Sequence, residues 1–116
     1  MLQILAHLAD AEIVGAWRFR SVLASDGVPL QAFDQNTWAA AFKYEETDPF
    51  QSWRLFEANR AALVALLRRV DQSRYAHFGM HEERGRESIE HLMRLNAGHD
   101  RNHLAQIERL LGQRGA

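Results

Sequence analysis

The sequence contains no cysteine, and its 116 residues include only two prolines and seven glycines. Without cysteine, the chain can form neither a disulfide framework nor a zinc–thiolate site, and it has no thiolate nucleophile. This absence fits a cytoplasmic location, which is our expectation. A metal ion bound to this chain would have to be held by histidine and carboxylate side chains.

The chain also lacks an excess of charge and a long apolar run. Fourteen Lys and Arg residues face fifteen Asp and Glu residues, a formal net charge of −1. A nucleic-acid binder needs a basic surface to release counterions from phosphates, so we expect no nucleic-acid partner. The longest apolar run, residues 61–67, is far shorter than the ~20 residues that cross a bilayer, so we expect no membrane partner. The N-terminus does not resemble a signal peptide.

The length suits a single domain spanning residues 1–116, and a hydrophobic fraction of 47% is enough to form a core. Apolar residues recur at spacings of three and four in three long segments, which predicts helices over residues 2–23, 49–70 and 89–111. The first of these carries few polar residues on any side and is predicted to be an interior helix. Asp48 and Ser88 are the predicted N-caps of the other two, because their side-chain oxygens can accept backbone N–H groups of a first turn.

The segments between these helices are polar or mixed. Residues 36–42 are predicted to form a short helix, and residues 71–87, which include two glycines, a long loop. No segment alternates with period two over the length of a strand, so the predicted fold is all-α. Arg60 falls within the apolar stripe of the second long helix, and it either reaches solvent at the edge or is buried with a charged partner.

Histidine pairs carry the strongest functional signal. Six histidines form two pairs at i,i+4, His77/His81 and His99/His103, where chance alone gives about 0.3 of a pair. The first pair lies in the polar loop, where this spacing has no fixed geometry, and we interpret it as coincidental. His99 and His103 lie one turn apart on the apolar face of the last predicted helix, where two imidazoles can share a metal ion. The alternative is a pair of hydrogen-bonded core histidines without an ion.

A usual histidine site with an open position needs a third ligand. His7, in an apolar setting early in the first helix, is the best candidate. His91 is weaker, because it falls between the apolar and charged faces of the last helix. Asp100 stands where the His-Glu-x-x-His motif of zinc proteases has glutamate, and its shorter side chain does not supply the general base of that motif.

Two segments resemble the signature segments of a known family. HLADAE (residues 7–12) and GHDRNHLAQI (residues 98–107) are similar to those of the DinB-like superfamily of metalloproteins, and residues 33–38 and Gly85 also match its usual pattern. The resemblance covers nearly the whole chain. It implies a four-helix bundle that holds one divalent ion, zinc or nickel, through three histidines, which here are His7, His99 and His103. The fourth ligand position would hold water or substrate.

The resemblance also implies an activity. Members of the family include transferases and isomerases that use bacterial low-molecular-weight thiols, so we expect a bacterial metal-dependent hydrolase or thiol-dependent transferase with a small-molecule substrate. The sequence shows no clear arginine cluster for an anionic thiol. The candidates for a general base are four residues of the predicted loops: Asp34, Glu45, Glu46 and His81. Asn102 and Gln106 are candidates to hydrogen-bond the metal ligands.

Two further hypotheses stay open: a non-catalytic, metal-stabilised helical module that binds a ligand or a partner, and a metal-free dimerisation module. In the family, a further helix precedes the one that carries the first histidine, whereas His7 here stands six residues after Met1. We therefore expect three long helices and a short one, without the first helix of the family. The apolar face left uncovered would be buried in a homodimer, and its predicted residues are Leu2, Leu5, Ile13 and Trp17.

Overall fold

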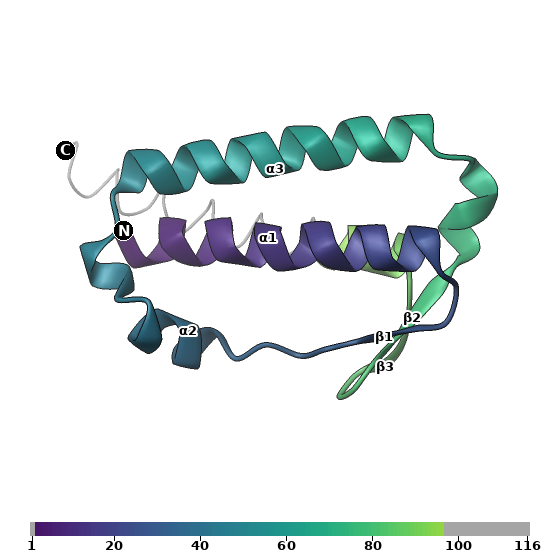
Figure 1. The fold of residues 1–116 in the computed structure, drawn as a ribbon, viewed down its shortest axis with the longest axis horizontal. Helices are drawn as coiled ribbons and strands as arrows, with labels where there is room; N and C mark the ends of the chain where they lie inside the picture. The colour runs from purple at the N-terminus through teal and green to yellow at the C-terminus, as the bar shows by residue number, and fades with distance from the viewer. Residues whose placement is uncertain (1, 97–116) are drawn as a thin grey trace.

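The computed structural model describes residues 2–96. Its two long helices, α1 (Leu2–Ala24) and α3 (Pro49–Arg69), lie side by side (Figure 1). Both run in the same direction, because the chain returns between them through the strand β1 (Val28–Leu30), the short helix α2 (Gln35–Ala41) and the 3-10 helix η1 (Tyr44–Glu46). After α3 come the 3-10 helix η2 (Gln72–Ala76), the strands β2 (Phe78–His81) and β3 (Gly85–Ser88), and a helix whose described residues are 89–96.

Local sequence signals fix where the helices start. The Asp48 carboxylate accepts a backbone N–H of the first turn of α3 at 2.9 Å, and the Ser88 hydroxyl accepts the N–H of His91 at 3.1 Å. Both predicted N-caps are therefore confirmed. The predicted short helix is α2, which begins after Asp34, whose carboxylate accepts two N–H groups of its first turn. These elements confirm the predicted helical fold class.

The segment over residues 71–87 is not the long loop that the sequence predicted. It forms η2 and then an antiparallel hairpin of β2 and β3, while β1 adds to β2 in parallel and completes a three-stranded sheet in the order β1-β2-β3. Each strand has three or four residues, too short to show an alternating pattern, and β1 pairs with a segment about fifty positions away. The sheet is a small addition to a mainly helical fold.

Glycine at position 79 allows this sheet to pack closely on α1. A Cβ atom there would lie 2.6 Å from Leu30 Cδ1 and 2.9 Å from Val22 Cγ2, closer than carbon atoms approach in packed proteins. Gly85 begins β3 with φ of +78°, a left-handed conformation that favours glycine. The hairpin therefore depends on two glycines for two different reasons.

The main core lies where the second half of α1 meets α3, the sheet and the last helix. Its buried side chains are Phe19, Val22, Leu23, Leu30, Leu63, Ile89 and Leu92. Since Ile89 packs with Val22 and Asn96 lies beside Gly15, the helix that begins at residue 89 runs back along α1. The region between α1 and this helix is where the sequence places its metal site.

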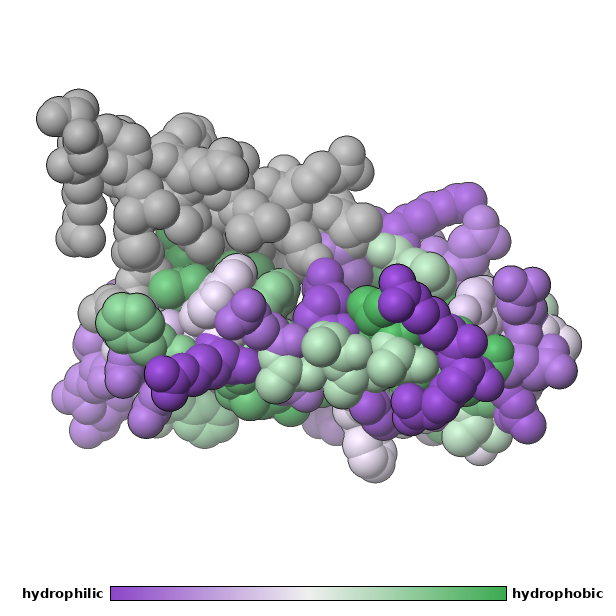
Figure 2. Space-filling view, turned by 90° about the horizontal axis from the view of Figure 1, so that it is seen from above, coloured by the Kyte–Doolittle hydropathy of each residue, from purple (hydrophilic) through white to green (hydrophobic). Residues whose placement is uncertain are grey.

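The surface over α3 mixes hydrophilic residues with small apolar ones (Figure 2). α1 is central, but it is not buried on all sides as predicted, because Trp17 is 73% exposed and Ile13 is 42% exposed. No helix within residues 2–96 is both long and apolar enough to cross a lipid bilayer.

Candidate metal centre

His7 is the one predicted metal ligand that lies within the described residues. It occupies the second turn of α1 and is buried, with 8% of its surface exposed. It also borders a cavity of about 180 Å³ between the start of α1, α2 and η1, whose other lining residues are Gln3, Ile4, Gln35, Asn36, Ala39 and Tyr44. A buried imidazole at the edge of a cavity fits a metal ligand whose ion keeps an open coordination position.

His99 and His103 lie outside the described residues, and so do Asn102 and Gln106. Among residues 2–96, no three His, Asp or Glu side chains lie close enough together to hold a metal ion. The set of three histidine ligands therefore stays a prediction. His91, the weaker candidate for the third ligand, is half exposed on the helix that begins at residue 89, with its Nε2 atom 3.3 Å from the Glu87 carboxylate.

A buried tyrosine and an aspartate lie next to His7. The Tyr44 hydroxyl donates to Asp10 Oδ2 at 2.5 Å, and Asp10 follows His7 by three positions, so the two share a face of α1. Burial raises the pKa of the Tyr44 phenol far above its usual range, and the hydrogen bond to Asp10 and the negative charge of Asp10 raise it further. The phenol is therefore held protonated at the edge of the cavity.

Sequence reasoning missed this tyrosine–aspartate pair. The two residues are 34 positions apart, and Tyr44 lies in a short 3-10 helix without a regular pattern around it. The one available signal was Asp10 itself, which belongs to the HLADAE segment.

None of the four predicted general-base candidates lines the cavity beside His7. Asp34 caps α2, and the hydrogen bonds that it accepts, first from the backbone N–H of Thr37, lower the pKa of its carboxyl. Glu45 and Glu46 are exposed on η1. His81 is buried within the hairpin.

The His77/His81 pair has structural roles in the hairpin. His77 Nδ1 lies 3.0 Å from the backbone carbonyl oxygen of Val22, to which it donates. His81 Nδ1 accepts the backbone N–H groups of Glu83 and Arg84, both at 3.1 Å, and so it shapes the turn between β2 and β3. The two rings therefore hold different parts of the backbone.

Arg60 combines features of its two predicted environments, because its side chain is 31% exposed and also has a charged partner. Its guanidinium forms a two-pronged ion pair with Glu12, with both N–O distances at 2.8 Å. Glu12 is 3% exposed, so this pair satisfies a buried carboxylate and joins α1 to α3. It fixes the face that α1 turns toward α3, and thereby the direction in which His7 points.

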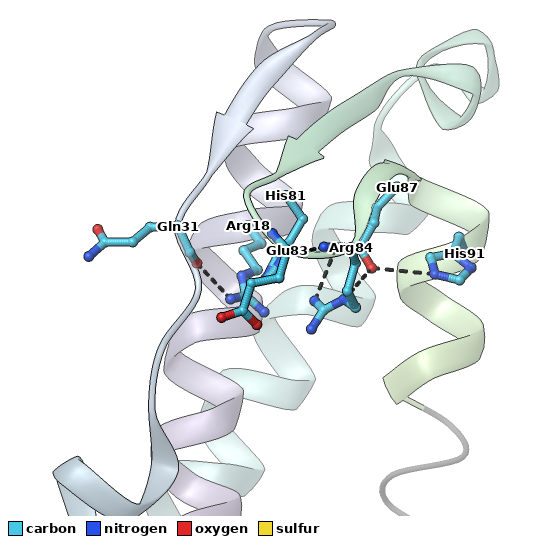
Figure 3. Close-up of polar contacts among 7 residues, drawn as sticks. All are labelled: Arg18, Gln31, His81, Glu83, Arg84, Glu87 and His91. Carbon is cyan, nitrogen blue, oxygen red and sulfur yellow. Dashed lines mark hydrogen bonds and ion pairs between the residues drawn. The ribbon is translucent and has the colours of Figure 1, made fainter.

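A second polar cluster lies where α1, the hairpin and the last helix meet (Figure 3). Glu87 is fully buried and accepts two hydrogen bonds from Arg84, at 2.9 and 3.0 Å. Arg18, on α1, donates to the carbonyl oxygen of Gln31 at 2.7 Å. Arg18 and Arg84 line one cavity of about 230 Å³, so the fold forms an arginine cluster that the sequence did not reveal.

Comparison with known proteins gives the family context. The family model of the DinB superfamily matches residues 1–107. Two curated relatives are "Putative metal-dependent hydrolase YfiT" of Bacillus subtilis, 24% identical over 97% of this chain, and "Putative metal-dependent hydrolase OB0782" of Oceanobacillus iheyensis, 28% identical over 93% of it. The chain spans 64% and 62% of their lengths, just under two thirds.

A solved structure has the same fold. YfiT from Bacillus subtilis, described as having an unusual four-helix bundle topology, superposes with a TM-score of 0.90 at 23% sequence identity. The superposition covers 98% of this chain and 66% of the other. The arrangement of α1, α3 and the helix from residue 89 therefore follows this bundle topology.

Proposed function

The chain belongs to the DinB superfamily, and from this premise we propose that it is a metal-dependent enzyme, either a hydrolase or a thiol-dependent transferase. Its divalent ion, zinc or nickel, is held by His7, His99 and His103. The observation that carries the proposal is the placement of His7, which is buried and yet borders a cavity. The two curated relatives are both named "Putative metal-dependent hydrolase", and these names support the same class.

His7, His99 and His103 would hold the divalent ion, which when bound would supply Lewis-acid chemistry toward a carbonyl group, a water or a thiol. The chain's own residues shape the cavity around the reacting groups. Tyr44 presents a protonated phenol at the cavity edge, and its hydrogen bond fixes the Asp10 carboxylate behind it. We assign Tyr44 as the residue that positions a water or a substrate hydroxyl, since its one O–H is donated to Asp10 and its phenol oxygen can still accept a hydrogen bond.

The metal content of purified protein without an affinity tag tests the ligand set. We expect about one divalent ion per chain, with clear loss of the ion in His7→Ala and in His103→Ala. His77→Ala is the matched control, because His77 belongs to the hairpin, and it should keep the ion. Equal metal content in wild type and in the His7 and His103 variants would remove the proposed site.

A substrate screen separates an enzyme from a non-catalytic module. Ester, amide and electrophilic small molecules are tested with the metal-loaded protein, each with and without a low-molecular-weight thiol. Turnover that requires the thiol identifies a transferase, and turnover without it identifies a hydrolase. Tyr44→Phe should raise KM or lower kcat while leaving the metal content unchanged, because it removes only the phenol oxygen.

A further inference from the structure

We propose that the cavity between α1, the hairpin and the last helix is an oxyanion subsite, in which Arg18 and Arg84 receive a carboxylate or phosphate group of the substrate or thiol cosubstrate. That the bound anion belongs to a substrate or cosubstrate rests on the proposed function. The binding of an anion follows from the cavity itself and can be tested without the metal.

The lining of the cavity combines positive charge with apolar walls. α1 contributes Ala11, Gly15, Arg18 and Phe19, the last helix contributes Leu92, Leu95 and Asn96, and Arg84 comes from the hairpin turn. Among the described residues, the two charged side chains in the lining are both arginines. A guanidinium in a partly apolar recess is suited to carboxylates and phosphates, because its fork of donors matches their oxygens.

Two buried donors in this polar cluster have no acceptor among residues 2–96, and the first of them belongs to a residue that lines the cavity. One is Arg18 Nε and the other is His81 Nε2. Since His81 Nδ1 accepts two backbone N–H groups, the ring proton must sit on Nε2. Burial lowers the pKa of His81, and the charges of Arg84 and Arg18 lower it further, so the ring is neutral at pH 7 and Nε2–H is a donor. Buried donors are almost always satisfied, so these two indicate an acceptor outside residues 2–96, and a bound oxyanion is the acceptor that we propose for Arg18 Nε.

The charges around the cavity also favour an anion. Glu87 is paired with Arg84, whereas Arg18 donates to the neutral carbonyl oxygen of Gln31. Burial lowers the pKa of Arg18, the nearby Arg84 charge lowers it further, and Glu87 opposes this effect. Glu83 is exposed on the turn and is not among the described residues that line the cavity. An oxyanion between the two arginines would relieve their repulsion and accept from Arg18 Nε.

The subsite lies next to the candidate metal centre. His7, Ala11 and Arg18 lie on one face of α1, and Gln35 lines both the cavity beside His7 and the cavity beside Arg18. His7 and Arg18 are separated by about 16 Å along the helix axis. The geometry fits an elongated small molecule that carries its anionic group at one end and its reacting group at the other.

Anion binding is measured by titration calorimetry on chelator-treated, full-length protein at constant ionic strength. Inorganic phosphate and acetate are the probes, and chloride is the reference anion. We expect saturable binding of one or both probes. Phosphate should bind with the higher affinity if the natural ligand carries a phosphate ester. Acetate should bind with at least equal affinity if the natural ligand carries a carboxylate. A saturable shift of the imidazole Nε2–H resonance of His81 in NMR spectra should accompany binding.

Arg18→Gln should weaken binding by about tenfold or more, since it removes charged hydrogen bonds. Arg20→Gln is the matched control, because Arg20 is exposed on the same helix and bonds only the carbonyl oxygen of Ala16. Gly15→Leu is a second test, since it fills the cavity without changing charge, and it should weaken binding similarly. Arg84 is left intact because its loss would remove both of the guanidinium hydrogen bonds that the buried Glu87 accepts.

Absence of binding by both probes, or wild-type affinity in both Arg18→Gln and Gly15→Leu, would overturn the subsite. Loss of affinity in Arg20→Gln equal to that in Arg18→Gln would overturn it as well, since binding would then follow net charge alone. Metal content is measured separately, so the two proposals fail independently. A protein that binds phosphate but no metal keeps the subsite and loses the enzyme proposal.

Discussion

The two ends of α1 are buried by different means. At the histidine end, around His7, the buried neighbours on α1 are two alanines and one leucine (Ala6, Ala9 and Leu8), and cavities of about 180 and 500 Å³ adjoin Tyr44. At the sheet end, from Phe19 onward, large side chains pack against the sheet and the last helix. Among residues 2–96, α1 therefore joins an end bordered by cavities to an end that packs against the main core.

The difference indicates that one end of α1 contributes mainly to stability and the other end to the proposed site. The packed end fixes the position of α1 and of the Arg18 side chain beside it, while the open end leaves room for a ligand at His7. An enzyme that holds an anionic group at one point and reacts at another needs such a fixed distance between the two. The predictions below test whether the two ends can be perturbed separately.

The largest effect is expected at the sheet end. Phe19 is 2% exposed and belongs to the main core, so Phe19→Ala should lower the free energy of unfolding by about 3–5 kcal/mol. Phe50→Ala is the matched control, because Phe50 is 73% exposed, and it should change stability by about 0.5 kcal/mol or less. Urea denaturation of both variants measures the difference. Similar losses in the two would show that the core does not lie where the packing indicates.

The next largest expected change is the stabilisation of the folded protein by a metal ion bound at the histidine end. An ion that binds only the folded state adds about 2.7 kcal/mol when free metal is a hundred times Kd, or about 10 °C or more in Tm for a small domain. His103→Ala should remove most of this metal-dependent increase, whereas His77→Ala should keep it even if its overall Tm falls. Melting curves with zinc, with nickel and with chelator make the comparison.

The same increase should shrink as the pH falls. Ligand imidazoles must be neutral, and free imidazole side chains take up a proton near pH 6.5, so protons compete with the ion below that value. The metal-dependent shift in Tm should be fully present at pH 8 and should decline through pH 6 in the wild type. A shift that does not change with pH would argue against histidine ligands.

The sequence predicted those parts of the molecule that depend on local signals. Asp48 followed by Pro49, and Ser88 ahead of an apolar run, mark helix starts by their own hydrogen-bonding chemistry, so these could be predicted. The sheet could not, because the pairing of β1 with β2 is a contact between distant segments. For the same reason, neither the Tyr44–Asp10 pair nor the approach of Arg84 to Arg18 could be predicted from the sequence.

Histidine spacing was informative only where helical geometry gave it meaning. His99 and His103 share a predicted helix face, and their test lies outside the described residues. His81 was assigned to a loop, yet its ring accepts two backbone N–H groups in a tight turn and leaves a buried donor facing the arginine cluster. A residue of this kind can be recognised only when the turn around it is known.

Substitutions on the predicted dimer face should change the free energy of dimerisation by less than the metal changes the free energy of unfolding. Trp17 and Ile13 are exposed on α1, and we propose that this face is buried in a homodimer, since monomers seldom expose a contiguous apolar area of this kind. Of the other residues predicted for this face, Leu5 is partly buried. Trp17→Ser should weaken dimerisation by about tenfold or more, ~1.4 kcal/mol, with Trp53→Ser on α3 as the control. A wild type that sediments as a compact monomer at micromolar concentration would contradict the proposal.

The smallest expected change in the free energy of unfolding is at Gly15, on the wall of the cavity beside Arg18. Gly15 lies in the middle of α1, where glycine costs about 0.5–1 kcal/mol relative to alanine. An alanine Cβ there would meet Asn96 Nδ2 at 3.6 Å, an ordinary contact, so Gly15→Ala should raise the free energy of unfolding by that amount. Ala11→Gly, one turn earlier on the same cavity wall, is the matched reverse substitution and should lower it equally. Thermal melting with chelator measures both. If Gly15→Ala stabilises the protein but weakens phosphate binding, the glycine keeps the cavity open at the expense of helix stability. If Gly15→Ala destabilises the protein instead, glycine is required by the close approach of α1 to the last helix and not by the cavity.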